Sequence, residues 1–131
     1  MRRLFALGVI AVLGLAACGG GDGGDGGDEP ATCSPSGSAL SVTAENFAFD
    51  TDCLAAPADT DFTIELTNKD AGTPHNVAIL PEDGEGDALF QGELFEGVET
   101  QTYDVNGIPA GTYHFHCDAH PDQMQGTFIV E

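Results

Sequence analysis

The sequence predicts an all-β domain, and two observations support this. From residue 38 onward, apolar side chains recur at every second position in short runs, which is the period of a half-buried strand. Stretches rich in Asn, Asp and Gly separate these runs, and no segment has convincing helical periodicity. Several short, evenly spaced strands are typical of an antiparallel sandwich or barrel.

The N-terminal region is expected to lie outside this domain. Residues 1–17 combine a basic start with an apolar run that is too short to cross a bilayer core of about 30 Å, so we interpret them as a signal peptide. The run ends in Leu-Ala-Ala before Cys18, and glycines follow. This pattern resembles the lipobox of bacterial lipoproteins, which implies that Cys18 carries a lipid. The alternative is an ordinary signal peptide with a chance cysteine.

Residues 18–37 are predicted to be the lipidated cysteine and a flexible linker. The segment 19–29 consists almost entirely of Gly and Asp, which cannot build a core. It is expected to hold the folded domain, residues 38–131, off a membrane surface. The chain is therefore predicted to be exported and anchored on the periplasmic or extracellular face.

The charge is strongly acidic. The chain has 22 acidic residues and a formal net charge of −19, and Lys69 is the only basic residue after Arg2 and Arg3. Such a surface repels phosphates, which excludes nucleic-acid binding. It either steers a basic partner towards the protein or serves solubility, and both interpretations remain open.

Seven runs are expected to form strands, and residues 84–97 are expected to form a looser excursion. In the run 110–117, alternation directs Phe115 and Cys117 inward and turns His114 and His116 outward. In chain order the runs are 40–44, 47–49, 62–66, 77–79, 98–105, 110–117 and 126–130.

Cys33 and Cys53 flank the first two predicted strands. In an exported protein we expect them to form a disulfide, and closing a loop of this length stabilises by roughly 3 kcal/mol. The alternatives, two free thiols or two metal ligands, are disfavoured because no histidine lies near them in the sequence.

Cys117, His120 and Met124 lie in one short loop between the last two predicted strands. Thiolate, imidazole and thioether are soft or intermediate ligands, a set that suits copper. His75, at the start of an upstream strand, offers a second imidazole. Zinc is the main rival, but structural zinc sites use four strong ligands, and a thioether is not one of them. Each residue alone also has an ordinary structural explanation, so the prediction depends on their combination.

These motifs resemble those of the plastocyanin-like cupredoxins, which have a type 1 blue copper site. The matching pieces are Pro-His75-Asn-Val, Gly-Thr-Tyr-His-Phe-His-Cys117, Cys-x-x-His120-Pro and Met124-x-Gly, and the resemblance covers residues 38–131. It implies a Greek-key β-sandwich of about seven to eight strands. It also implies that His75, Cys117 and His120 are equatorial copper ligands.

The resemblance further implies that Met124 is the axial ligand and that Asn76 orients the ligand loops. The spacing from His120 to Met124 is three intervening residues, where the family usually has four and some relatives have two. Gln123 is the nearby substitute for the axial position.

The predicted function is electron transfer by one copper ion, without enzymatic activity. No paired carboxylates, Ser-His-Asp set or phosphate-binding loop is evident, and the ligand set leaves no open position. The alternatives are copper storage or delivery, and an enzyme if Met124 does not bind the metal. The expected partners are redox proteins, including basic, cytochrome-like ones, and a monomer is expected. His116, beside the ligand Cys117, is a candidate docking point for a partner.

Overall fold

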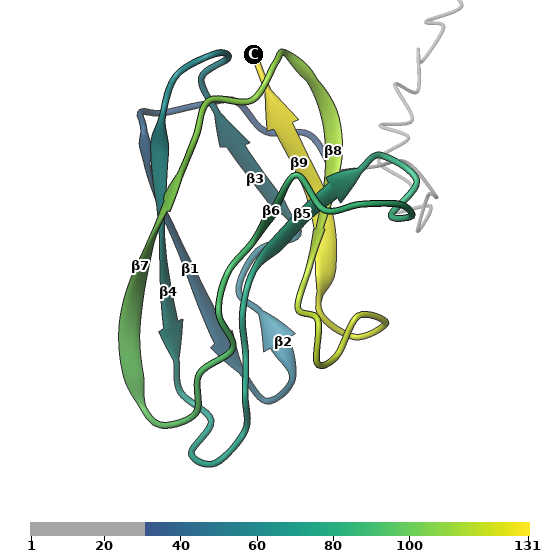
Figure 1. Ribbon diagram of the computed structural model, residues 1–131. Coiled ribbons are helices and arrows are strands. Elements are labelled where there is room, and N and C mark those ends of the chain that lie inside the picture. Colours follow the sequence, from purple (N-terminus) through teal and green to yellow (C-terminus); the bar gives the residue numbers. More distant parts are fainter. Residues whose placement is uncertain (1–30) are drawn as a thin grey trace, which may run out of the picture.

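The structure is a computed structural model that describes residues 31–131, and these residues form nine strands in two facing sheets (Figure 1). The predicted all-β sandwich is confirmed. The predicted signal peptide, Cys18 and most of the linker lie outside the described residues. Within residues 31–131 there is no helix with the length and apolarity needed to span a bilayer.

The first sheet has the order β2-β1-β4-β7. Its large apolar side chains alternate with polar ones, and the apolar set faces the second sheet, as the period-two runs predicted. The strands are β1 (Ala39–Glu45), β2 (Ala48–Phe49), β4 (Phe62–Asn68) and β7 (Glu99–Val105).

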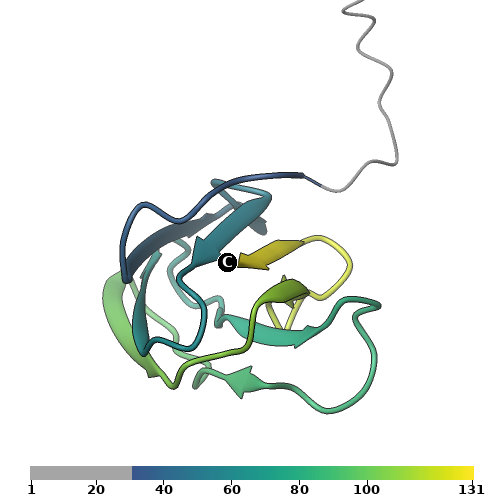
Figure 2. The same ribbon diagram turned by 90° about the horizontal axis from the view of Figure 1, so that it is seen from above.

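The second sheet has the order β3-β9-β8-β5-β6. In Figure 2 the two sheets are seen as two layers that face each other. The predicted excursion 84–97 contains β6, which pairs with the edge of β5. The strands are β3 (Cys53–Ala56), β5 (Ala78–Pro81), β6 (Phe90–Gln91), β8 (Gly111–His116) and β9 (Gln125–Val130).

Two strand pairs are parallel, β1 with β4 and β3 with β9, whereas the sequence predicted antiparallel pairing. The difference arises because β3 does not pair with β2 in the first sheet. The chain crosses to the second sheet as β3 and returns as β4, which therefore runs in the same direction as β1.

The core lies between the sheets. Phe115 and Phe128 are fully buried, and together with Ile64 and Leu66 they are among its largest buried side chains. Burying an aliphatic or aromatic side chain of this kind stabilises the fold by about 1.5–3 kcal/mol. Because β8 and β9 contribute to this core, the loop that joins them is fixed at both ends.

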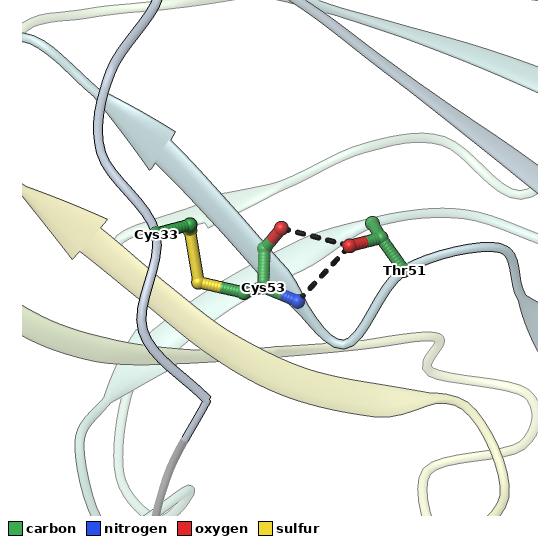
Figure 3. The surroundings of a disulfide bond; sticks show 3 residues. All are labelled: Cys33, Thr51 and Cys53. Atoms are coloured by element: carbon green, nitrogen blue, oxygen red, sulfur yellow. Dashed lines mark hydrogen bonds between the residues drawn. A yellow bond between two sulfur atoms is a disulfide. The ribbon is translucent and has the colours of Figure 1, made fainter.

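The predicted Cys33–Cys53 disulfide is present, with an S–S distance of 2.05 Å (Figure 3). It ties the segment before β1 to the start of β3. The Thr51 hydroxyl accepts a hydrogen bond from the Cys53 amide and donates one to the Cys53 carbonyl. The disulfide therefore fixes the point where the chain enters the domain.

Candidate metal centre

The loop between β8 and β9 carries three of the four predicted ligands, and it lies at the lower end of the sandwich in Figure 1. Its backbone closes on itself. The Cys117 amide donates to the Met124 carbonyl at 2.9 Å, and the Met124 amide donates to the His120 carbonyl at 3.0 Å. These bonds hold Cys117, His120 and Met124 in one compact turn.

His75 reaches this loop from the connection between β4 and β5. Its backbone pairs with Phe95 through two hydrogen bonds of 3.2 Å, three residues before β5 begins. The His75 side chain is completely buried. The strand that was predicted to begin here begins at Ala78 instead, and the bridge to Phe95 fixes His75 in its place.

The Nδ1 atom of His75 lies 3.8 Å from the Sγ atom of Cys117. This separation is long for a strong hydrogen bond. Bonds of about 2.3 Å to sulfur and about 2.0 Å to nitrogen, meeting at a metal at about 120°, would separate the two atoms by about 3.7 Å. Cys117 is a buried, free thiol. The pair therefore has the separation of two ligands of one metal ion.

Asp70 binds the other nitrogen of His75. Its Oδ2 atom lies 2.8 Å from Nε2. The Asn46 amide, followed by the His75 ring, lowers the pKa of the Asp70 carboxyl below its ordinary value. An ionised carboxylate can only accept hydrogen bonds, so Nε2 carries the proton. The lone pair of Nδ1 is then directed towards Cys117, the tautomer that a metal needs.

Asn68 positions Asp70 from within the core. Its side chain is fully buried and donates to the carbonyl groups of Thr73 and Phe95, at 2.9 and 3.2 Å. Its Oδ1 atom accepts from the Asp70 amide at 2.8 Å. Asn68 therefore ties the Asp70 turn to the segment that pairs with His75.

Asn76 connects the His75 segment to the ligand loop. Its Nδ2 atom donates to the Gly92 carbonyl at 2.8 Å and to the Asp118 carboxylate at 2.7 Å. Its Oδ1 atom accepts from the Asp118 amide at 2.8 Å. Asn76 directly follows His75, and Asp118 directly follows Cys117. These bonds therefore tie the backbone next to one candidate ligand to the backbone next to the other.

The Asp118 carboxylate also accepts a hydrogen bond from Gln91 at 2.7 Å. Burial raises the pKa of Asp118, but hydrogen bonds from Gln91, Asn76 and His116 outweigh this effect and bring the pKa below its ordinary value. The group is therefore an anion at neutral pH. The side chains of Gln91, Asn76 and His116 all bond to this carboxylate, which directly follows Cys117 in the chain.

His120 lies beside the His75–Cys117 pair, with its ring centroid 5.3 Å from that of His75. Its Nε2 atom is buried and has no hydrogen-bond partner. A buried polar atom without a partner costs about 1–3 kcal/mol. Within residues 31–131, no three His, Cys, Asp or Glu side chains form a ready metal-binding group. The structure thus brings His75 and Cys117 together and leaves His120 next to them with an unused nitrogen.

The two candidates for the axial position differ in burial. Met124 is completely buried, whereas Gln123 is exposed. Of the two, Met124 is buried as His75 and Cys117 are, so the candidate donors are one thiol, two imidazoles and one thioether. The residues fit a metal that accepts sulfur and nitrogen together.

The two other histidines point away from the core, but they are less exposed than strand alternation predicts. The His116 side chain is 14% exposed, and its Nε2 atom lies 2.9 Å from Oδ1 of Asp118. The His114 ring lies over the turn at Gly84. Burial, and secondarily His116, lowers the pKa of His114.

Three residues that support the candidate ligands were not predicted from the sequence, namely Asn68, Asp70 and Phe47. The Phe47 ring lies edge-on to His120, with 4.9 Å between ring centroids. Phe47 was predicted to lie in a strand, but it occupies the turn between β1 and β2. The one local signal that could have distinguished Phe47 from a core residue was the possibility that Asn46 and Phe47 form a two-residue turn between strands.

Comparisons with known proteins agree with this fold. Auracyanin from the photosynthetic bacterium Roseiflexus castenholzii aligns with a TM-score of 0.65 and 19% identity, covering 74% of this chain and 99% of that one. Auracyanin A, a "blue" copper protein of Chloroflexus aurantiacus, aligns with a TM-score of 0.62 and 23% identity, covering 71% and 98%. These two likenesses concern the fold alone.

A proline-to-phenylalanine mutant of amicyanin, in its reduced state, is 30% identical, with a TM-score of 0.52 and coverage of 71% of this chain and 82% of that one. A search of curated protein sequences finds no significant match. The family described as cupredoxin-like domain matches residues 26–130, which is most of the chain. The chain therefore belongs to the cupredoxin-like domain family.

Proposed function

We propose that the chain is a one-electron carrier in which His75, Cys117 and His120 hold a single copper ion, with Met124 as the axial ligand. The observation that carries the proposal is the separation of 3.8 Å between His75 Nδ1 and Cys117 Sγ at a fully buried site. The unpartnered Nε2 of His120 and the burial of Met124 support the other two ligands.

A copper ion held by two imidazoles, a thiolate and a weak thioether would supply a one-electron couple with little rearrangement between its oxidation states. The protein's own residues keep the ligands in place. Asp70 fixes the tautomer of His75, and Asn76 and Asp118 tie the backbone around Cys117. Such outer hydrogen bonds stiffen a metal site and tune its potential.

The comparisons support copper as the metal. Auracyanin A is described as a "blue" copper protein, and one amicyanin structure is described as a reduced Cu(I) form. Four donors around one ion leave no position for a substrate. We therefore propose a carrier and not an enzyme.

We also propose that the protein works outside the cytoplasmic membrane, tethered through a lipid on Cys18. The Cys33–Cys53 disulfide supports an oxidising compartment. A tether would keep the domain, proposed as residues 38–131, near membrane-bound redox partners and raise their effective concentration. With 22 acids in the chain, a basic partner is favoured, and His116 beside Asp118 is the proposed docking point.

The first test is the visible and paramagnetic resonance spectrum of the full-length protein after addition of Cu(II). We expect an intense thiolate-to-copper charge-transfer band in the parent and its loss in Cys117→Ser. Cys117→Ser keeps the size of the side chain and removes the thiolate, which makes it a matched control. A colourless protein that holds zinc tightly would contradict the proposal.

Copper storage or delivery is distinguished by redox behaviour. A carrier shows a reversible Cu(II)/Cu(I) couple by voltammetry and keeps its copper in both states. If reduction instead releases the copper readily to a metal-free acceptor, the protein delivers copper and the carrier function is wrong.

A further inference from the structure

The turn between β1 and β2 lies beside the candidate metal centre and has an unfavourable residue at its second position. Glu45 pairs with Ala48, so Asn46 and Phe47 form a two-residue hairpin loop. Both have positive φ, 54° for Asn46 and 58° for Phe47. Turns of this kind favour Gly at the second position, and a bulky residue with positive φ is strained. The presence of Phe at this position therefore needs a compensating reason.

Asp70 holds this strained turn and the candidate ligand His75 at the same time. Its carboxylate accepts hydrogen bonds from the Asn46 amide at 2.8 Å and from the Phe47 amide at 3.3 Å. The same Oδ2 atom that binds the Phe47 amide also binds His75 Nε2. The position of the turn and the orientation of the imidazole thus depend on a single side chain.

The Phe47 ring packs against the imidazoles of His75 and His120 and is itself half exposed. It is 46% exposed, whereas His75 and Cys117 are completely buried. The ring is edge-on to His120, at 4.9 Å between centroids, and to His75, at 6.3 Å. A large apolar side chain that is half exposed loses burial energy but shields what lies beneath it.

We propose that Phe47 is a cover over the His75–Cys117–His120 cluster, and that Asp70 positions this cover. This geometry lays the ring against His120, and that contact is the compensating reason for the strain of the turn. The cover limits the entry of small molecules and sets the rate at which a metal enters or leaves. This inference concerns the cluster of the proposed function, but it requires neither a particular metal nor electron transfer.

The test measures the access of a small reagent to Cys117 in the metal-free, full-length protein. Alkylation by iodoacetamide is followed by peptide mass spectrometry, which separates Cys117 from the other cysteines. We expect Phe47→Gly and Phe47→Ala to be alkylated at Cys117 roughly tenfold faster than the parent, because the aromatic contact is lost. Phe47→Tyr, which keeps the ring, restores the slow rate.

Leu89→Gly is the matched control, because Leu89 is 43% exposed and lies in another loop. It is expected to leave the alkylation rate unchanged. Phe47→Gly also relieves the strain of the turn, so it is expected to unfold at a higher urea concentration than Phe47→Ala. Asp70→Asn weakens the hydrogen bonds of residue 70 to the turn and to His75, and it is expected to increase the alkylation rate as well.

The inference is overturned if Phe47→Gly and Phe47→Ala, both folded by circular dichroism, are alkylated at the parent rate. It is also overturned if Leu89→Gly accelerates alkylation as much as they do. A second readout is the release of bound copper to a chelator, which the two Phe47 truncations are expected to accelerate. If the parent binds no copper, the proposed function fails, but the alkylation rates still decide whether Phe47 is a cover.

Discussion

At the scale of single residues, Asn68 connects three parts of the chain that meet beside His75. Its amide group bonds the carbonyls of Thr73 and Phe95 and the backbone amide of Asp70. Its side chain has no access to water. A buried amide that satisfies three backbone groups cannot be replaced by an apolar side chain without leaving those groups unpaired.

We therefore predict that Asn68→Ala lowers the free energy of unfolding by about 2–4 kcal/mol, because buried backbone groups lose their partners. Urea denaturation of the metal-free protein measures the change. Asn106→Ala, at an exposed position, is the control and is expected to have little effect. An equally small effect at Asn68 would mean that water replaces its hydrogen bonds.

The ligands could be predicted from the sequence, but their supports could not. Cys117, His120 and Met124 lie within one loop, and soft donors are few in this chain, so their spacing is informative. Asp70 is one acid among 22, and its contacts with Asn46 and Phe47 cross 24 and 23 positions. No local sequence pattern predicts such a contact, because it depends on the pairing of β1 with β4.

At the scale of elements, alternation predicted the long strands well, since one buried face imposes a period of two. It could not separate the turn at Phe47 from a strand, because the two-residue strand β2 follows immediately. It also could not predict that β1 and β4 pair in parallel. That pairing depends on β3 crossing to the other sheet, which is a tertiary event.

The β8–β9 hairpin depends on a close approach at Gly126. A Cβ atom there would overlap the Asp52 carbonyl oxygen and lie 2.6 Å from Cε1 of Phe115. We predict that Gly126→Ala lowers the free energy of unfolding by about 1–3 kcal/mol, because the packed core must move. It should also broaden or shift the copper band, since β9 begins directly after Met124.

Gly111→Ala is the matched control for this prediction, because it lies on the partner strand β8. A Cβ atom at Gly111 would meet Tyr113 at 3.5 Å, an ordinary contact. We expect no measurable loss of stability from it in urea denaturation. If the two variants unfold alike, the close approach at Gly126 does not limit the hairpin.

At the scale of the whole molecule, acidic groups have few cations to pair with. Lys69, the one basic residue after Arg3, lies 3.8 Å from Glu45, and both side chains are 54% exposed. An exposed pair of this kind contributes little to stability. The remaining acids repel one another, which opposes the compact state and favours attraction of a basic partner.

The acidic surface makes the stability of the domain depend on salt. Salt screens repulsion between exposed charges, with a Debye length of about 30 Å at 0.01 M and about 3 Å at 1 M. Raising NaCl from low to high concentration should therefore increase the free energy of unfolding of the metal-free protein, by on the order of 1 kcal/mol. Repeating urea denaturation at each salt concentration measures the slope.

The acids of the 82–87 loop provide the internal control. Glu82, Asp83, Glu85 and Asp87 are all exposed and close in sequence, so they contribute to the repulsion. Replacing Glu85 and Asp87 with their amides should raise stability at low salt and reduce the salt dependence. If stability instead falls as salt is added, attractive charge pairs outweigh the repulsion, and the acidity has a structural role in the folded state. A salt dependence that the amide variant leaves unchanged would assign the repulsion to other parts of the surface.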